Sequence, residues 1–328
     1  MGCIKMLALV VKKSEVEKIK NMLYEKGLID ERRKFKKRNG EVEIPIKKRV
    51  NLPYEIIEQK EPLFRYITTF DEIKRSIGRD DIPKKWEKIG NVLILKGING
   101  NKEIAKVYAN VLKCKSVLED VGGIKGVKRI PCFELVYGNS TETIHVENGI
   151  KYKLDAQKIM FSSGNIDERI RMAKVARKNE IVVDMFAGIG YFSLPIAVYG
   201  KAKVFACEIN PVAYHYLKEN IILNEVFSLV IPLLGDCREV APKSIANRVI
   251  MGYLNSLDFF EYAIKILDNE GIVHFHQKCK KEDFPDKIFE RIKEIARKND
   301  KKVEILLSKK IKSYAPGIIH GVIDLEVF

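Results

Sequence analysis

Three acidic side chains stand at the ends of short apolar runs in the second half of the chain. Asp184 ends IVVD, Glu208 ends KVFACE, and Asp236 follows VIPLLG. Gly188 and Gly190 lie between the first two acids, where glycines let the backbone approach a ligand closely. An acid about 20 residues beyond such a turn can accept hydrogen bonds from both ribose hydroxyls. The spacing predicts a nucleoside site, although any one acid alone is better explained as a strand end or a helix cap.

The glycine turn also indicates which nucleoside is bound. Ser193 stands where a G-x-G-x-x-G motif has its third glycine. The incomplete motif argues against a pyrophosphate on the following helix and hence against NAD. Three acids at successive strand ends instead favour S-adenosylmethionine. In that layout Glu208 holds the ribose, and Asp236 with its neighbour Cys237 reaches the adenine.

The elements around these acids alternate between strand and helix. Helices are expected at 166–178, 211–224, 257–268 and 283–299, and strands at 180–185, 202–208, 229–234, 247–252, 271–277 and 302–308. Alternating units of this kind predict an α/β fold, a Rossmann-like domain with a doubly wound, mostly parallel sheet that binds ligands at the carboxyl ends of its strands. Two final β runs without a helix between them predict an antiparallel hairpin at one edge.

Smaller α+β regions are expected before this domain. We predict an accessory domain over 1–55, a middle region over 56–150 and the catalytic domain over 151–328, in line with the length of the chain. The first domain is expected to hold a helix with a capping box at Ser14 and Glu17, and a cationic hairpin that turns at Asn39 and Gly40.

Charge and cysteine content limit the function classes. The net charge is +15 and the sequence pI is about 9.3, which favours a polyanionic partner such as nucleic acid, although a lysine-rich proteome would also explain it. The basic tracts 32–38 and 309–312 are candidate phosphate contacts or solvated faces. Six scattered cysteines without a CxxC pair exclude a zinc ribbon and a disulfide framework and indicate a reducing cytoplasm. No apolar run is long enough to span a membrane.

Two histidines form the remaining cluster of metal-binding residue types. His274 and His276 alternate on one expected strand and therefore share a face. No further ligands are spaced to complete a metal site, so packing or a hydrogen bond is the better interpretation.

Several stretches together resemble one group of tRNA-modifying enzymes. The resemblance covers about residue 80 to the C-terminus and rests on FSSGNIDER, ACEINP, GDCR, ANRVIMGYLNS, HFHQKC and KSYAPGIIHGVIDLE. The group is that of the wybutosine-pathway enzymes, which transfer the 3-amino-3-carboxypropyl group of S-adenosylmethionine to 4-demethylwyosine in tRNA(Phe). Its parent superfamily is that of the class I tRNA guanine-37 N1-methyltransferases. The first 55 residues resemble the accessory RNA-binding domain of those methyltransferases more loosely.

The resemblance implies residue roles. Glu208 is implied as the ribose ligand, Asp236 and Cys237 as adenine contacts, and Ser162 and Arg169 as ligands of the methionine carboxylate end. A guanidinium can hold a carboxylate through two parallel hydrogen bonds. Without the motif, Arg169 would be interpreted as a helix-surface ion pair with Glu168 or Glu180.

Two departures separate this chain from the methyltransferases that it resembles. Residues 252–255 read GYLN where those enzymes have N-[LP]-P, and residues 163–165 read SGN where they carry an arginine. Both positions bear on methyl transfer to a guanine ring nitrogen, so the departures count against methylation.

The expected reaction is transfer of the aminocarboxypropyl group to C7 of 4-demethylwyosine at position 37, with release of methylthioadenosine. The expected partner is the anticodon loop of tRNA(Phe), and the chain is expected to be a monomer without a metal. No general base is assigned, although Asn165, Tyr253 and the two histidines are candidates. Tyr253 and Phe161 are candidates for stacking on the base, and filling of the core is an equal alternative for both. The alternatives are a guanine-37 N1-methyltransferase and an RNA-binding module without catalysis.

Overall fold

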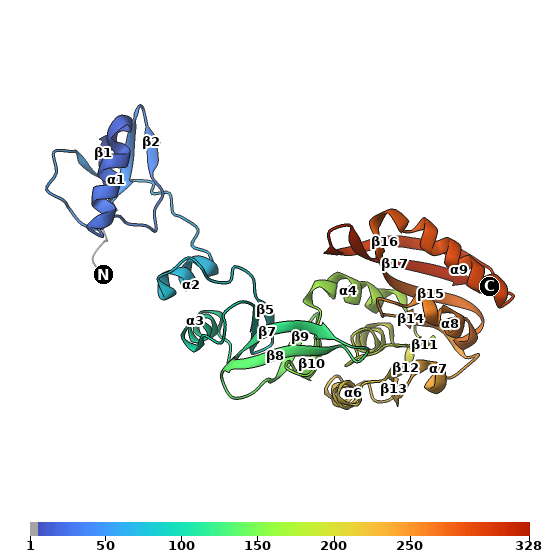
Figure 1. Cartoon of the computed structure of the whole chain (residues 1–328). Helices are drawn as coiled ribbons and strands as arrows, with labels where there is room; N and C mark the ends of the chain where they lie inside the picture. Colours follow the sequence, from blue (N-terminus) through green and yellow to red (C-terminus); the bar gives the residue numbers. More distant parts are fainter. Residues whose placement is uncertain (1–5) are drawn as a thin grey trace. The chain divides into compact units, whose positions relative to one another are not determined.

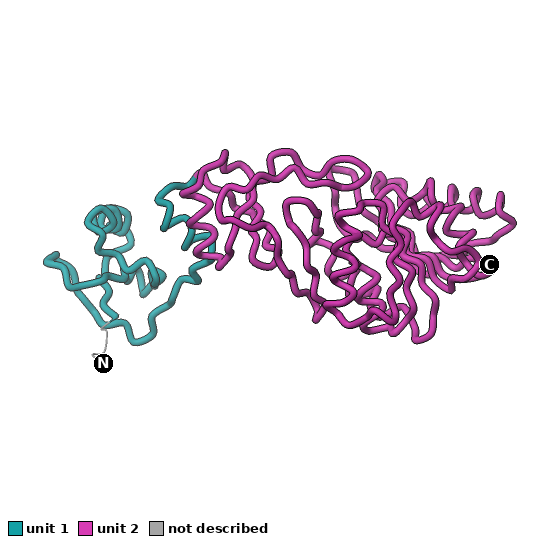
Figure 2. Tube along the Cα trace, turned by 90° about the horizontal axis from the view of Figure 1, so that it is seen from below, with its two compact units in different colours: residues 1–80 teal, residues 81–328 magenta. Residues whose placement is uncertain are grey.

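The computed structural model describes residues 6–328, and the chain divides into two compact units, residues 1–80 and 81–328 (Figure 2). The predicted domain limits at 55 and 150 stay a prediction.

The first unit contains a four-stranded antiparallel sheet and two helices. Its strands run in the order β2-β3-β1-β4, and its elements are β1 (Leu7–Lys12), α1 (Val16–Glu25), β2 (Lys36–Arg38), β3 (Glu41–Pro45), β4 (Ile56–Glu58) and α2 (Thr69–Ile77). The β2–β3 hairpin turns at Asn39 and Gly40, whose φ values are 36° and 86°. Two successive positive φ values are what a two-residue hairpin turn requires, which confirms the predicted turn.

The predicted capping box at Ser14 and Glu17 is wrong. A 3-10 turn over Lys13–Glu15 precedes α1, so Ser14 lies inside a turn and makes no side-chain cap. A capping box occurs instead at α2, where Thr68 Oγ1 accepts from the backbone N–H of Asp71 at 3.1 Å and the Asp71 carboxylate accepts from the N–H of Thr68 at 2.9 Å.

The second unit begins with a mixed sheet of order β5-β6-β7-β8, in which only β6 and β7 are parallel. An antiparallel hairpin and helix α4 then lead into the main sheet. These elements are β5 (Glu87–Ile89), β6 (Val92–Leu95), α3 (Lys102–Leu112), β7 (Ser116–Lys125), β8 (Ile130–Tyr137), β9 (Glu142–Glu147), β10 (Ile150–Asp155) and α4 (Ile166–Val175).

The main sheet has seven strands in the order β13-β12-β11-β14-β15-β17-β16 (Figure 1). The first five are parallel, whereas β17 runs antiparallel to both of its neighbours, which confirms the expected edge hairpin. The strands are β11 (Ile181–Asp184), β12 (Lys203–Glu208), β13 (Val230–Leu234), β14 (Ala246–Met251), β15 (Leu267–Lys280), β16 (Val303–Ala315) and β17 (Ile318–Val327). The predicted α/β fold with a doubly wound, mostly parallel sheet is confirmed.

Alternate residues of the central strands face two separate cores. Val182 of β11 belongs to a core that also contains α4 and α6 (Pro211–Leu223). Its neighbour Val183 belongs to a second core with α8 (Phe260–Ile266) and α9 (Asp286–Lys298). This alternation follows from the two-residue period of a strand, and it places helices on both faces of the sheet (Figure 1). The strand order reverses between β11 and β14, and such switch points open a crevice for ligands.

Candidate active site

A cavity of about 190 Å³, partly open to solvent, lies at the carboxyl ends of β11, β12 and β14. It is therefore located where a doubly wound sheet is expected to bind a ligand. Its wall also includes the loop between β7 and β8, the segment before α4, and the β16–β17 hairpin. The lining residues are Val127, Lys128, Arg129, Lys158, Ile159, Met160, Ser162, Asn165, Arg169, Phe186, Gly188, Tyr191, Phe192, Glu208, Ile209, Asn210, Ala213, Gly252, Tyr253, Leu254, Lys312, Tyr314 and His320.

Glu208 is held by backbone donors at the floor of this cavity. Its two carboxylate oxygens accept hydrogen bonds from the N–H groups of Gly188 at 2.7 Å and Asn210 at 2.6 Å. Gly188 has φ +59°, and a Cβ there would lie 2.5 Å from the ring of Tyr191, so the turn requires glycine. Burial raises the pKa of Glu208, against the opposing effect of the backbone hydrogen bonds. The carboxylate is thus fixed in place with lone pairs left for ribose hydroxyls.

The other two acids at strand ends, Asp184 and Asp236, accept hydrogen bonds from neighbouring protein groups. Asp184 is fully buried and accepts hydrogen bonds from Ser193 Oγ at 2.7 Å and from the N–H of Phe186 at 3.3 Å, so it holds the glycine turn. Burial raises its pKa to about 6. Asp236 caps the short helix α7 (Cys237–Val240) and accepts from the N–H and from Nε of Arg238, both at 2.9 Å.

Neither Asp236 nor Cys237 is among the residues that line the cavity. Cys237 is 5% exposed, and burial raises the pKa of its thiol to about 12, so it is a neutral thiol at physiological pH. The adenine roles of both residues stay a prediction.

Arg169 lines the cavity but is already paired with a carboxylate. Its Nε and Nη2 donate to the two oxygens of Glu147 on β9, each at 2.6 Å, and its Nη1 donates to the backbone oxygen of Ser162 at 2.9 Å. The ion pair with Glu168 or Glu180 that the sequence suggested for Arg169 is therefore wrong. Burial raises the pKa of Glu147, but the hydrogen bonds from Arg169 outweigh burial and bring this pKa to about 2.

Ser162 lines the cavity beside Arg169 and is contacted by two cationic side chains, Arg169 and Lys312. Its hydroxyl oxygen accepts a hydrogen bond from Lys312 Nζ at 2.9 Å. Sequence reasoning identified Lys312 only as part of a basic tract. Its position in the cavity depends on the pairing of β16 with β17, which the local sequence does not reveal.

The aromatic candidates differ in exposure. Phe161 is 4% exposed and packs against the rings of His145, Tyr152 and Tyr191, so it belongs to the core and the stacking role suggested for it is wrong. Tyr253 lines the cavity, with its ring centroid 5.2 Å from that of Phe186.

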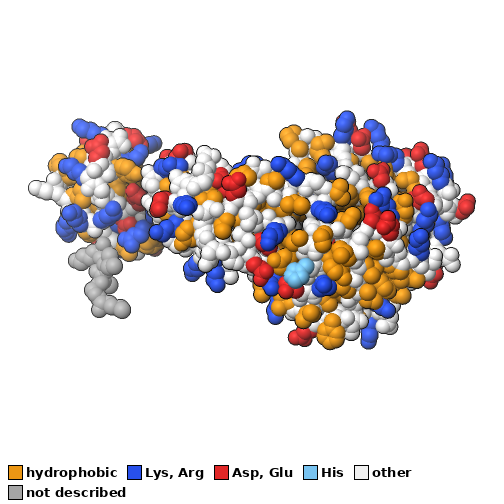
Figure 3. Space-filling model, turned by 60° about the horizontal axis from the view of Figure 1, so that its bottom comes forward, with side chains coloured by type: hydrophobic (Ala, Val, Ile, Leu, Met, Phe, Trp, Pro, Cys, Tyr) orange, Lys and Arg blue, Asp and Glu red, His pale blue; other side chains and the backbone are white. Residues whose placement is uncertain are grey.

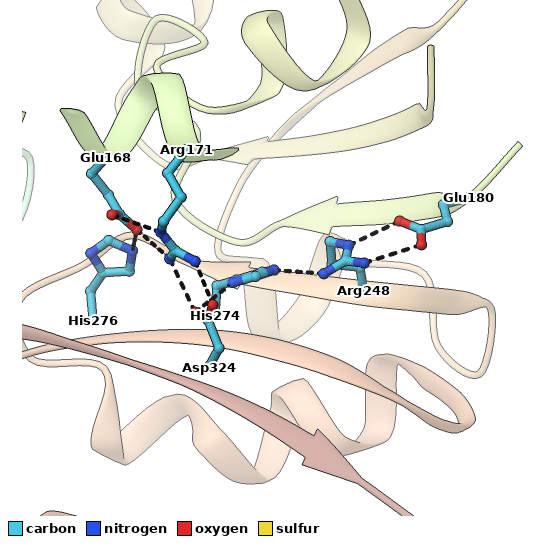
Figure 4. Close-up of polar contacts among 7 residues, drawn as sticks. All are labelled: Glu168, Arg171, Glu180, Arg248, His274, His276 and Asp324. Atoms are coloured by element: carbon cyan, nitrogen blue, oxygen red, sulfur yellow. Dashed lines mark hydrogen bonds and ion pairs between the residues drawn. The ribbon is translucent and has the colours of Figure 1, made fainter. Parts of the chain in front are cut away.

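His274 belongs to a buried network that joins α4 to three strands (Figure 4). Its Nδ1 lies 2.7 Å from Asp324 Oδ1, and its Nε2 lies 2.7 Å from Nη1 of Arg248. Arg171 Nη2 donates to Asp324 Oδ1 at 3.1 Å and also pairs with Glu168, while Arg248 Nε donates to Glu180 Oε2 at 2.9 Å. Both ring nitrogens of His274 are engaged, so it is not free to act as a base.

His276 contacts a third histidine. Its Nδ1 lies 3.0 Å from Nε2 of His320, which lines the cavity, whereas His276 does not. Burial lowers the pKa of both imidazoles to about 3, so both are neutral at physiological pH. Among residues 6–328, no group of three or more His, Cys, Asp or Glu side chains is arranged to hold a metal ion.

The polar groups that line the cavity fit S-adenosylmethionine. A fixed carboxylate is available for the ribose at Glu208, and the cation of Lys312 lines the same cavity. Two buried polar atoms of lining residues, Asn165 Oδ1 and His320 Nδ1, have no hydrogen-bond partner within residues 6–328. Unpaired buried polar atoms are costly, so a polar ligand is expected to satisfy them.

Comparison with family models gives three matches along the chain. Residues 143–306 match the TRM5/TYW2 methyltransferase domain, and residues 71–141 match the TYW2 N-terminal domain. Residues 8–54 match the tRNA methyltransferase 5 N-terminal domain.

Comparison with individual proteins gives matches to the same family. A tRNA(Phe) (4-demethylwyosine(37)-C(7)) aminocarboxypropyltransferase from Pyrococcus horikoshii is 48% identical over 252 residues, which cover 75% of this chain and 90% of that protein. The tRNA (guanine(37)-N(1))-methyltransferase Trm5b of Pyrococcus abyssi is 38% identical and covers 98% of this chain and 99% of its own length. The crystal structure of P. horikoshii TYW2 in complex with MeSAdo matches with a TM-score of 0.71 and 44% identity, and covers 78% of this chain and 98% of that chain. The chain therefore belongs to the TRM5/TYW2 family.

Proposed function

We propose that the cavity of the second unit binds S-adenosylmethionine and the base that is modified. The chain is a tRNA-modifying transferase: it moves the 3-amino-3-carboxypropyl group of S-adenosylmethionine to C7 of 4-demethylwyosine at position 37 of tRNA(Phe) and releases methylthioadenosine. The observation that carries the site assignment is the Glu208 carboxylate, fixed by two backbone N–H groups at a strand end.

The chemistry requires one bond to form and one to break. S-adenosylmethionine, when bound, supplies an electrophilic methylene next to its sulfonium, and the carbon–sulfur bond breaks with its electron pair going to sulfur. C7 forms the new carbon–carbon bond and then loses its proton. The protein must hold the two reactants in line, and alignment of this kind supplies several of the roughly 7–11 kcal/mol available from proximity.

We assign residue roles in and beside the cavity. Glu208 accepts the ribose hydroxyls, and Asp236 with Cys237 is assigned to the adenine side. Ser162 and Arg169 form the wall next to the methionine end, with the Arg169 guanidinium oriented by Glu147. Tyr253 is the aromatic side chain placed to stack on the modified base.

The test uses tRNA(Phe) that carries 4-demethylwyosine, with S-adenosylmethionine as co-substrate. Mass spectrometry of the nucleoside at position 37 is expected to show the mass of the added aminocarboxypropyl group, with methylthioadenosine as the small product. S-adenosylhomocysteine and a methylated nucleoside would instead show a methyltransferase, and unchanged tRNA would contradict both.

We also assign the anticodon loop of tRNA(Phe) as the part of the RNA that enters the cavity, because position 37 lies beside the anticodon. Among residues 6–328, no helix is long and apolar enough to cross a membrane. The free cysteines at 114, 132, 207, 237 and 279 suit a reducing cytoplasm. We further assign the chain as a monomer, and sedimentation equilibrium measures its mass.

A further inference from the structure

Lys312 differs from the other lysines of its strand. Lys309 and Lys310 are exposed, whereas Lys312 is half-buried and lines the cavity. The pairing of β16 with β17 shifts register between Lys310 and Lys312 and again between Ser313 and Ala315. Irregularities of this kind re-aim side chains and recur next to active sites. The shifts therefore place one lysine of a basic tract against the cavity, directly opposite His320 on the neighbouring strand.

The Lys312 ammonium makes no salt bridge within residues 6–328, and Glu87 is the carboxylate whose charge acts on it from a distance. The ammonium donates to the neutral hydroxyl of Ser162 at 2.9 Å. Burial lowers the pKa of Lys312, and the nearby cations Arg169 and Arg129 lower it further, whereas Glu87 raises it. A partly buried cation without a salt-bridge partner is unfavourable, so an anionic ligand at this position would stabilise it.

Arg169 is less available for the same anion. Two of its nitrogens already donate to Glu147, and a third donates to the Ser162 backbone. A second carboxylate would have to compete with Glu147 or approach it closely, and like charges at such a distance repel each other. Lys312 meets no such competition, because its hydrogen-bond partner is uncharged.

The same wall offers acceptors for a positive group. Asn165 Oδ1 is buried without a partner, and Asn165 lies in the segment 163–165 that precedes α4. His320 Nδ1 is also without a partner, and it is an acceptor in the tautomer whose Nε2–H donates to His276. A cation and neutral acceptors side by side match the carboxylate and the ammonium of an α-amino acid.

We propose that Lys312 binds the α-carboxylate of the transferred 3-amino-3-carboxypropyl group, and that Asn165 accepts a hydrogen bond from its α-ammonium. The inference rests on the proposed function and names the subsite for the group that moves. Lys312 is then a positioning residue: it fixes the far end of the chain whose methylene must face C7. A phosphate of the tRNA would satisfy the cation alone and would leave the acceptor of Asn165 unpaired.

The experiment compares two ligands that differ in this tail. S-adenosylmethionine carries the tail on its sulfonium, whereas methylthioadenosine has the same nucleoside and S-methyl group but neither the tail nor the sulfonium charge. Isothermal titration of Lys312→Met is expected to show S-adenosylmethionine binding weakened at least tenfold, with the methylthioadenosine affinity changed less than twofold. Lys312→Arg is expected to recover most of the affinity, and Asn165→Leu to weaken S-adenosylmethionine alone.

Lys310→Met is the matched control, because it removes an exposed lysine two residues away on the same strand. It is expected to leave both ligand affinities unchanged. Equal weakening of both ligands by Lys312→Met would show a structural role and overturn the proposal. Unchanged S-adenosylmethionine binding with a reduced salt dependence of tRNA binding would show a phosphate contact and overturn it as well. Failure of the proposed function would appear separately, as the wrong nucleoside product from the unaltered protein.

Discussion

At the scale of single residues, the site depends on two carboxylates that are fixed in different ways. Glu208 is held by backbone N–H groups, and its oxygens retain lone pairs that a ligand can use. Glu147 instead orients Arg169 through two hydrogen bonds. Glu208 was predictable, because a glycine turn and an acid at a set distance form a local signal. Glu147 was not, because its role depends on a contact with Arg169 across 22 residues and between two elements.

Replacing Glu208 with alanine is expected to weaken S-adenosylmethionine binding at least tenfold, about 1.4 kcal/mol, because charge-assisted hydrogen bonds to the ribose are lost. Isothermal titration measures the dissociation constant. The exposed Glu261→Ala serves as the control, since Glu261 lies on α8 and is not among the residues that line the cavity. An unchanged dissociation constant for Glu208→Ala would remove this residue from the site.

The pair of Glu147 with Arg169 is expected to make stability depend on pH. The folded-state pKa of Glu147 is about 2, below its ordinary 4.5, so its ionisation stabilises the fold above pH 4.5 and this contribution is lost as the pH falls from 4.5 to 2. We expect Glu147→Gln to be less stable at pH 7 by roughly 3 kcal/mol, with the difference shrinking as the pH falls. Urea denaturation at several pH values measures it, and a difference independent of pH would contradict the assignment.

At the scale of elements, the buried network beside α4 holds one wall of the site in place. Arg171 of this helix pairs both with Glu168 of the same helix and with Asp324 of β17, and the network continues through His274 to Arg248 (Figure 4). It ties the helix that carries Arg169 to the antiparallel part of the sheet. The position of the cavity wall therefore depends on contacts with residues more than 150 positions later in the chain.

Arg171→Met is expected to lower the free energy of unfolding by about 3–5 kcal/mol, because Glu168 and Asp324 would be left as uncompensated buried charges. Lys265→Met removes an exposed partner of Glu261 and is expected to change stability by less than about 1 kcal/mol. Urea denaturation of both variants provides the comparison. Equal small effects would show that the network is exposed to water in solution.

Most elements of the main sheet were predictable because local signals mark their limits, such as the capping Asn210 and the following Pro211 at the start of α6. Strand β12 and helix α6 begin and end within one residue of their predicted limits. The long hairpin was predicted too short: β16 reaches Ala315, seven residues beyond the expected end at 308, because its lysine-rich half is held by pairing with β17 rather than by an apolar pattern. The same half carries Lys312. The role of Lys312 and the full length of β16 therefore escaped prediction for the same reason, namely that both depend on the pairing with β17.

At the scale of the whole molecule, the net charge of +15 is expected to dominate tRNA binding. On the face shown in Figure 3, lysine and arginine side chains occur on the surface of both units, and hydrophobic side chains are also exposed on the second unit. The tract 32–38 is not uniform. Arg33 is 1% exposed and donates to Asp30 and Gln59, so its suggested role as a phosphate contact is wrong, whereas Lys37 and Arg38 are exposed.

The affinity for tRNA is expected to fall steeply as salt concentration rises. Lysine and arginine side chains that neutralise phosphates release the counterions that were bound to the RNA, and added salt opposes this release. Lys37→Ala and Arg38→Ala are each expected to reduce the slope of log affinity against log salt by about 1 if they contact phosphates. Filter binding at several salt concentrations measures the slope. A flat salt response would contradict an electrostatic interface, and unchanged slopes for both variants would remove this tract from it.

The position of β16 at the end of the sheet has a consequence for solubility. Strand β16 is a thirteen-residue edge strand, so one side of it presents unpaired backbone N–H and C=O groups. Another molecule can pair with such groups, and this pairing often initiates aggregation. The exposed Lys309 and Lys310 and the irregular pairing beside them oppose such stacking, because charges repel a second copy and a kinked strand offers a poor template. The lysines that resemble an RNA contact in the sequence thus also keep neighbouring molecules apart.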